Sequence, residues 1–149
     1  MFTTTNPFIS SGAFQKKERK MNQHKRVWIY CRVANTDTIA LENQKRLLVD
    51  YSEQKGFEVV GITAEIAHGS SIKRRGMADV FSAASKRRID ILLVVNPARI
   101  TRKISEFLYC VKKLNGYGVE ILTPTSGVVG LPEADFYARI AGIAKNMKG

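Results

Sequence analysis

The sequence has 149 residues, of which 44% are hydrophobic and 25% charged, a composition typical of one globular domain and not of a disordered chain. Lysine and arginine number 24 against 13 for aspartate and glutamate, so the formal net charge of +11 favours a polyanionic partner, above all nucleic acid. The longest apolar run, residues 91–95, is far too short to span a membrane, and the first twenty residues lack the apolar core of a secretory signal. The two cysteines form neither a disulfide framework nor a zinc pattern, so we expect a cytoplasmic protein with reduced thiols and no metal or other cofactor.

The first 25 residues have the composition of a tail. Residues 1–14 are rich in Thr, Ser and Asn without periodicity, and Gln15–Lys20 is a basic run. Such runs are usually solvated appendages rather than specific readers of a partner. We therefore predict a basic, disordered tail over residues 1–25.

From Arg26 onward, predicted strands and helices alternate. Short β-branched and apolar runs predict strands, and apolar residues at i, i+3, i+4 and i+7 predict helices. The strands are expected at residues 27–33, 57–64, 89–95 and 119–123. The helices are expected from residue 37 or 38 to 56, then over 77–84, 104–116 and 136–147.

This alternation predicts an α/β fold, an open and mostly parallel sheet of about four strands with helices on both faces. We expect the domain to cover residues 26–125, followed by a linker and the start of a C-terminal helix over 126–149. The apolar stripe of that last helix suits either a core face or a dimer face, and the sequence leaves both open.

Arginines follow three of the predicted strands, where the ligand site of an open α/β sheet lies. Arg32 ends the first strand, Lys73, Arg74 and Arg75 follow the second, and Arg99 and Arg102 follow the third. A guanidinium is a planar fork that donates two parallel hydrogen bonds to a phosphate. The sequence therefore predicts an anion site at this edge. The alternative is that each arginine is solvated or paired with Glu65, Asp90 or Glu106.

Four segments, in order and at similar spacing, resemble the catalytic domain of serine recombinases, the family of resolvases, invertases and large serine integrases. These segments are Tyr30–Val33, Leu41–Gln44, Gly69–Met77 and Arg99–Arg102. The resemblance runs from about Arg26 to Thr123, and a weaker similarity continues in the last predicted helix. It implies a resolvase-like fold.

The resemblance also implies a function, DNA strand exchange without metal or nucleotide cofactor. In that family a serine hydroxyl attacks a DNA phosphorus and forms a phosphoserine, while arginines stabilise the charge on the phosphoryl oxygens. The matching catalytic positions here are Arg32, Arg74, Arg99 and Arg102, with Gln44 as polar support. Lys73 and Arg75 are expected to join Arg32, Arg74, Arg99 and Arg102 in binding DNA phosphate.

The position of the nucleophile departs from the family, because Ala34 stands where the serine is expected. A methyl group has no lone pair to donate, so the covalent step is unavailable. Ala98 stands where the family commonly has Asp, and His68 stands where a serine usually precedes the glycine. These departures predict impaired catalysis.

No other residue replaces the serine convincingly. On an alternating strand Cys31 faces away from Arg32 and Ala34, so we expect a core thiol. Thr36 and Thr38 follow Ala34 without an obvious base, and His24 precedes the first strand at the opposite end of the sheet.

Three functions remain open from the sequence. The first is a DNA-binding, resolvase-type domain whose catalysis is lost or rerouted, acting as a homodimer or as a heterodimer with another recombinase through the C-terminal helix. The second is a non-catalytic DNA-binding or interaction module that modulates an active recombinase. The third is an unrelated α/β domain for a small phosphorylated ligand. The resemblance also leads one to expect a separate DNA-reading domain after the last helix, and the sequence predicts no recognition helix.

Overall fold

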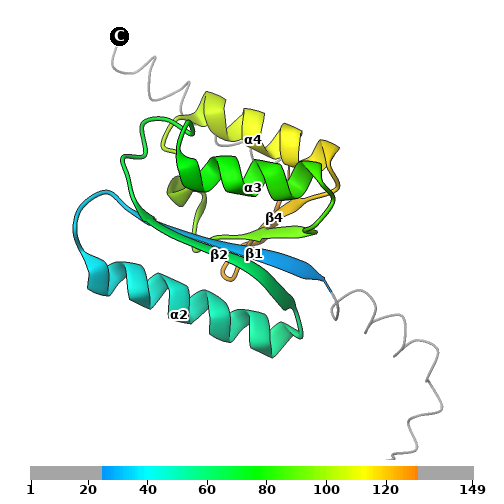
Figure 1. Ribbon diagram of the computed structural model, residues 1–149, viewed down its shortest axis with the longest axis horizontal. Helices are drawn as coiled ribbons and strands as arrows, with labels where there is room; N and C mark the ends of the chain where they lie inside the picture. The colour runs from blue at the N-terminus through cyan, green and yellow to red at the C-terminus, as the bar shows by residue number, and fades with distance from the viewer. Residues whose placement is uncertain (1–24, 131–149) are drawn as a thin grey trace, which may run out of the picture.

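A computed structural model describes residues 25–130 of the chain. The sheet is built from β1 (Arg26–Val33), β2 (Glu58–Ile66), β3 (Ile91–Leu93), β4 (Glu120–Thr123) and β5 (Gly127–Val129). The helices are α2 (Thr38–Lys55), α3 (Arg75–Ser85), the short 3-10 helix η2 (Pro97–Arg99) and α4 (Ile104–Gly116). Figure 1 shows the sheet between α2 on one side and α3 with α4 on the other.

The strand order is β2-β1-β3-β4-β5, and every neighbouring pair is parallel except β4 with β5. The predicted open, mostly parallel sheet with helices on both faces is therefore confirmed. The carboxyl ends of β1, β2 and β3 meet at one edge, on the left in Figure 1, and their amino ends meet at the opposite edge. We call these the carboxyl edge and the amino edge.

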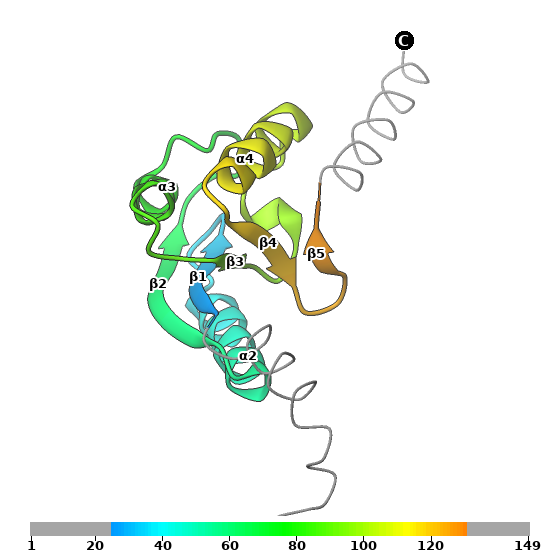
Figure 2. The same cartoon turned by 90° about the vertical axis from the view of Figure 1, so that its right-hand side faces the viewer.

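The alternation of side chains along β1 builds two separate cores. Val27, Ile29 and Cys31 pack with Leu48 of α2. Tyr30 lies on the other face, in a larger cluster with buried residues of α3 and α4. Figure 2 shows this three-layer arrangement. Since burying one large apolar side chain contributes about 1.5–3 kcal/mol, the clusters on both faces stabilise the sheet.

The ends of α2 follow from its flanking residues. The Asp37 side chain accepts a hydrogen bond from the Ala40 amide at 2.9 Å, which is an N-cap. Gly56 ends the helix in the left-handed conformation, with φ 73°. The predicted helix from residue 37 or 38 to 56 is confirmed.

Two elements were not predicted. The 3-10 helix η2 lies between β3 and α4, and β5 forms an antiparallel hairpin with β4 past residue 125, where we expected the linker to begin. The hairpin turn is held by a bond from the Ser126 amide to Thr123 Oγ1 and by Gly127 at φ 73°. A three-residue strand gives too short a pattern to recognise in sequence.

The tail up to residue 24 and the helix expected over 136–147 lie outside the described residues. Within residues 25–130, no helix is both long enough and apolar enough to cross a membrane.

Candidate functional site

The carboxyl edge brings together Arg32, Arg74, Arg99 and Arg102. Arg32 lies near the end of β1, Arg74 is the N-cap of α3, and Arg99 is the last residue of η2. Arg102 lies between η2 and α4, and its amide donates to the carbonyl of Gly69 at 2.9 Å. The sequence predicted this convergence, and we call these four residues the arginine rim.

Arg32 is the most buried member of the rim, with 1% of its surface exposed. Its guanidinium donates three hydrogen bonds to backbone carbonyls, from Nε to Arg99 at 2.8 Å, from Nη1 to Ala67 at 2.7 Å and from Nη2 to Ala98 at 2.7 Å. These carbonyls belong to the loops after β2 and β3. Arg32 therefore fixes two loops of the carboxyl edge against β1.

Gln44 of α2 holds the backbone of Arg32. The Arg32 amide donates to Gln44 Oε1 at 3.3 Å, and Gln44 Nε2 donates back to the Arg32 carbonyl at 3.0 Å. Gln44 is buried, so these paired bonds satisfy its amide group in place of water. Gln44, expected from the sequence as polar support for the arginines, thus contacts the backbone of Arg32.

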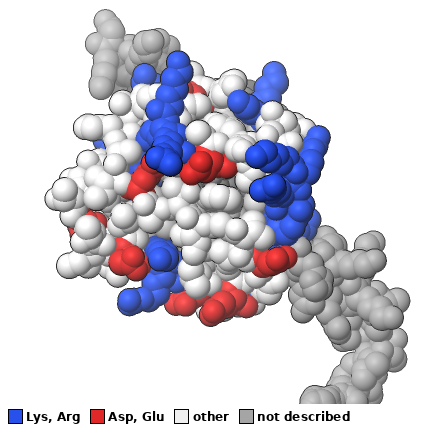
Figure 3. All heavy atoms as spheres, viewed as in Figure 1, with Lys and Arg blue, Asp and Glu red and all other residues white. Residues whose placement is uncertain are grey.

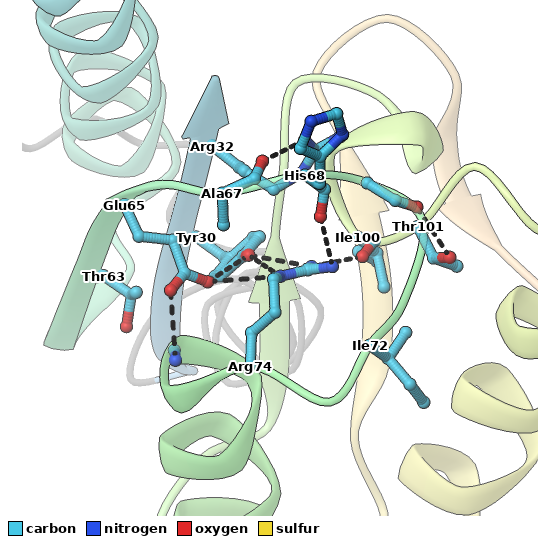
Figure 4. A network of polar contacts seen from close by, with 12 residues as sticks. Tyr30, Arg32, Thr63, Glu65, Ala67, His68, Ile72, Arg74, Ile100 and Thr101 are labelled. Atoms are coloured by element: carbon cyan, nitrogen blue, oxygen red, sulfur yellow. Dashed lines mark hydrogen bonds and ion pairs between the residues drawn. The ribbon is translucent and has the colours of Figure 1, made fainter. Parts of the chain in front are cut away.

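Arg74 lies in a network with Tyr30 and Glu65, shown in Figure 4. Its Nε is 3.5 Å from Glu65 Oε2, and its Nε and Nη2 donate to Tyr30 Oη at 3.1 and 2.9 Å. Tyr30 donates its hydroxyl proton to the same Glu65 oxygen. The Arg74 guanidinium also donates to backbone carbonyls of the loops after β2 and β3, those of His68, Ser71 and Ile100.

Burial, followed by the hydrogen bond to Glu65, raises the pKa of Tyr30 above its ordinary value, although the nearby Arg74 acts in the opposite direction. Tyr30 is therefore a neutral donor in this network at physiological pH, and its fully buried hydroxyl is unsuited to act as a nucleophile. The alternative considered from sequence, that the arginines pair with acids, holds for Arg74 with Glu65. The other two acids considered there, Asp90 and Glu106, form no ion pair with the rim within residues 25–130, and Asp90 binds Arg26 instead.

Glu106 has a different role, which the sequence analysis missed. Its Oε1 accepts the Ile72 amide at 3.1 Å and lies 2.8 Å from Thr101 Oγ1. It thereby ties the loop after β2 to the start of α4. An acidic residue in the first turn of a predicted helix is the sequence signal that suggests such a role.

Arg99 and Arg102 have free donors. Arg99 Nη1 donates to the Arg32 carbonyl at 3.2 Å, whereas Arg99 Nε is the one buried side-chain nitrogen or oxygen between residues 25 and 130 without a hydrogen-bond partner. The side chain of Arg102 is exposed and forms no hydrogen bond or ion pair within that range. An unpaired buried donor costs about 1–3 kcal/mol. Because Nε is buried, Nη2 is the donor of Arg99 that remains for an anion, since no hydrogen bond uses it among the described residues.

The rim is electrostatically unfavourable while it holds no anion. Burial lowers the pKa of Arg32, and the positive charges of Arg74, Arg102 and Arg99 lower it further. The positive N-terminal end of α3 adds to the same field. A bound phosphate group would attract each of these positive charges and so offset the repulsion between them.

Lys73 and Arg75 are not part of the rim contacts. They line a separate groove of about 630 Å³ between α3 and α4, together with Phe81, Tyr109 and Lys113. Both side chains are exposed and unpaired among the described residues. Arg74, which also lines this groove, connects it to the rim.

Ala34 lies directly after β1 and is exposed, beside the rim. The following loop is exposed as well: the Asn35 side chain accepts the Asp37 amide, and no side-chain bond of Thr36 or Thr38 to a base is found within the described residues. Cys31 is fully buried against α2, and burial raises its pKa to about 12. The prediction of a core thiol is confirmed. His24 lies outside the described residues.

Gly69 is a further site residue that the sequence analysis did not single out. A Cβ atom there would stand 2.7 Å from Arg32 Nη2 and 3.0 Å from Arg102 Cγ. The glycine therefore allows the loop after β2 to lie against the rim. A glycine between polar residues just after a strand is the signal for such a close approach.

The fold and this edge define a class of protein, an open parallel α/β domain with a cluster of arginines at the carboxyl ends of its strands. The chain belongs to the resolvase family, because its residues 27–148 match the family described as "Resolvase, N terminal domain". It is a domain of the serine recombinase catalytic type. A search of curated proteins gave no match.

Solved structures agree with this assignment. The C-terminal catalytic domain of ISC1926 TnpA, an IS607-like serine recombinase, is 32% identical with a TM-score of 0.63, and the match covers 66% of each chain. The N-terminal catalytic domain of TP901-1 integrase (20% identity, TM-score 0.67) matches over 83% of this chain and 97% of its own. A resolvase family site-specific recombinase from Streptococcus pneumoniae (21% identity, TM-score 0.65) matches over 83% and 91%. The last two share the fold.

Proposed function

We propose that this domain binds the phosphate backbone of DNA at the arginine rim and holds it without cutting it. The observation that carries the proposal is the contrast between the rim and residue 34. Arg32 and Arg74 are held by several hydrogen bonds to backbone carbonyls, whereas an exposed methyl group stands where the family places its serine.

The four rim arginines have two different roles in this proposal, positioning and phosphate contact. Arg32 and Arg74 are positioning residues, because carbonyl groups and Glu65 already occupy most of their donors. Arg99 and Arg102 contact the phosphate, since each has guanidinium nitrogens that form no hydrogen bond within the described residues. Lys73 and Arg75 meet neighbouring phosphates along the groove between α3 and α4, and Gln44 supports Arg32.

The covalent step of the family does not occur in this proposal. A phosphoserine requires an oxygen that attacks phosphorus, and Ala34 has none. Donors at the rim lower the energy of a charged transition state but supply no attacking atom. The domain therefore acts as a binding module that has retained the electrostatics of a recombinase.

The same contrast favours a role in a mixed assembly. We propose that the chain pairs with a second copy or with an active recombinase in the cytoplasm, through the helix expected over residues 136–147. A subunit that binds DNA without cleaving it then limits which DNA strands its partner subunit can exchange. A stable complex with an active recombinase that changes its strand exchange supports this role.

One experiment distinguishes DNA binding from DNA cleavage. The full chain is incubated with nicked suicide duplexes and run on denaturing gels, in parallel with a salt titration of duplex binding. We expect no protein–DNA adduct and an affinity that falls steeply with salt. We also expect the salt slope to fall by about one unit in Arg99→Ala and in Arg102→Ala.

The control is Arg46→Gln, an exposed cation on α2, which should leave the slope unchanged. A covalent adduct with the wild-type chain overturns the loss of chemistry. An unchanged slope in both rim variants overturns the assignment of the phosphate site.

A further inference from the structure

A second cluster of cations lies at the amino edge of the sheet, at the opposite end of β1 from the arginine rim. Lys86, Arg87 and Arg88 follow α3 and precede β3, and all three are exposed. Lys25 and Arg26 lie at the same edge, because β1 pairs with β3 from Val27 and Ile91. Figure 3 shows Lys and Arg side chains gathered on the right, where α3 ends and β1 begins. We call Lys86–Arg88 the amino-edge cluster.

The turn that presents this cluster has a defined geometry. The Arg88 amide donates to the Ala83 carbonyl at 2.9 Å, and the Arg87 amide donates to the Ala84 carbonyl at 3.0 Å. These two bonds are those of a Schellman motif that ends α3. Arg87 occupies the left-handed position, with φ 58°, and it is the one non-glycine residue with positive φ in the described chain.

Glycine is the residue expected at this position, because a Cβ in the left-handed conformation is strained. The helix dipole favours a cation at the end of α3, and Lys86 already supplies it. The dipole therefore gives no reason for an arginine at residue 87. Strain that is retained at one residue is a reason to look for a function of its side chain.

The Arg87 side chain is held in place. Its guanidinium carbon lies 5.8 Å from the centre of the Tyr117 ring, a cation–π contact that keeps the group at the surface. None of the three cations of the cluster forms an ion pair within residues 25–130. Asp90, which follows the cluster by two residues, binds Arg26 with an Nη2–Oδ1 distance of 3.1 Å. Asp79 lines a pocket with Lys86 and Arg88 but forms no ion pair with either.

We propose that the amino-edge cluster binds the backbone of a second DNA duplex, so that one domain bridges two duplexes. This inference rests on the proposed function for its choice of polyanion. Three adjacent unpaired cations suit the regular spacing of phosphates, and the basic run Gln15–Lys20 precedes this edge in the sequence.

Two different duplexes are needed because of the geometry of β1. The strand has eight residues, so the two edges are separated by about 26 Å, more than twice the Debye length of roughly 10 Å at 0.1 M salt. The edges also face in opposite directions. Duplex DNA, with a persistence length of about 50 nm, is too stiff to lie against both.

The test compares the full-length wild-type chain with the variant Lys86→Gln/Arg87→Asn/Arg88→Gln. Asparagine at residue 87 keeps a side chain that tolerates the left-handed conformation, so the turn is preserved. The matched control removes the same charge from helix surfaces elsewhere, as Lys45→Gln/Arg46→Gln/Lys112→Gln. Thermal melting checks that all three proteins fold.

Bridging is measured by capture of a fluorescent 30-bp duplex on beads that carry a second, biotinylated duplex of unrelated sequence, and anisotropy gives the salt slope. We expect the wild type and the control to bridge, and the cluster variant to lose bridging and about two to three units of salt slope. If the cluster variant bridges duplexes as well as the control and has the same salt slope, the inference is overturned. The proposed function is still supported in that case if Arg99→Ala and Arg102→Ala lower the slope. A wild-type chain that binds no duplex overturns both.

A single substitution tests the meaning of the strained residue. Arg87→Gly relieves the left-handed strain, so we expect a higher melting temperature together with weaker bridging. Higher stability with unchanged bridging would show that the arginine is not kept for DNA, and would overturn the inference.

Discussion

Gly69 lies against the guanidinium group of Arg32, so closely that a Cβ atom at residue 69 would stand 2.7 Å from Arg32 Nη2. The Arg32 side chain is 1% exposed and bonded to three carbonyls, so it has no room to move aside. The Gly69 carbonyl also accepts the Arg102 amide. One glycine thus sets the spacing between the two loops that form the rim.

Replacing this glycine with alanine is expected to open the rim. Gly69→Ala must break bonds of Arg32 or shift the loop, and overpacking of this kind costs about 1–3 kcal/mol. Chemical denaturation measures the loss of stability, and the salt titration measures the loss of DNA affinity. Gly116→Ala is the control, because a Cβ there meets nothing within 4 Å. Equal stability of the two variants would contradict the close packing at Gly69.

Glu65 is expected to be a stabilising partner of Arg74 and Tyr30. Glu65→Gln removes the negative charge that faces a guanidinium with a side chain only 7% exposed. We expect a loss of about 2–3 kcal/mol, since a largely buried cation then lacks its counter-charge. Glu58→Gln, an exposed position on the same strand, should change the free energy of unfolding by less than about 0.5 kcal/mol. Similar losses in both variants would rule out a special role for Glu65.

Asp90 is expected to make folding sensitive to acid. Hydrogen bonding to Arg26 holds the pKa of Asp90 below its ordinary value of 3.8 in the folded chain. The stabilisation is therefore present above about pH 4 and is lost as the pH falls through the lower, folded-state pKa. Its size is under about 1 kcal/mol, because the Arg26 and Asp90 side chains are 39% and 30% exposed. Unfolding of Asp90→Asn between pH 2 and 6 should show a weaker pH dependence than the wild type.

The two cysteines are expected to resist thiol reagents while the chain is folded. Burial raises the pKa of Cys31 and of Cys110 to about 12, so thiolate is scarce at pH 8. We expect slow reaction with an aromatic disulfide reagent in buffer and rapid reaction in denaturant. Ala34→Cys provides an exposed thiol for comparison, and it should react quickly in the folded protein. Rapid reaction of the wild type in buffer would contradict the burial of both thiols.

Restoring the hydroxyl group at residue 34 is expected to be insufficient for efficient strand exchange. Ala34→Ser supplies an attacking oxygen next to the rim, but Ala98 still stands where the family commonly has a carboxylate. Suicide-substrate gels report any covalent adduct, and a two-site plasmid reports strand exchange. Efficient exchange by this single variant would show that residue 34 alone accounts for the lost activity.

The fold was largely predictable because its signals are local. The alternation of residues along 27–33 predicted that Cys31 and Tyr30 face opposite sides of the sheet, and the structure confirms it. The hairpin strand β5 was missed because three residues carry no detectable period, and its pairing depends on a turn at Ser126 and Gly127. The left-handed turn at Arg87 was missed because its signal, a glycine, is replaced by an arginine.

The sequence by itself determined the layered α/β fold and the presence of arginines after three parallel strands, since both depend on periodicity and on the order of elements along the chain. Only the tertiary structure decided which arginines remain free. Arg32 and Arg74 are bonded by carbonyls and by Glu65 from other elements, whereas Arg99 and Arg102 retain unbonded donors. The physical reason is that folding brings distant backbone carbonyls against a guanidinium, and these carbonyls then accept the hydrogen bonds that a ligand would otherwise receive. For Arg32 they belong to Arg99 and Ala98, which lie 67 and 66 positions away in the chain.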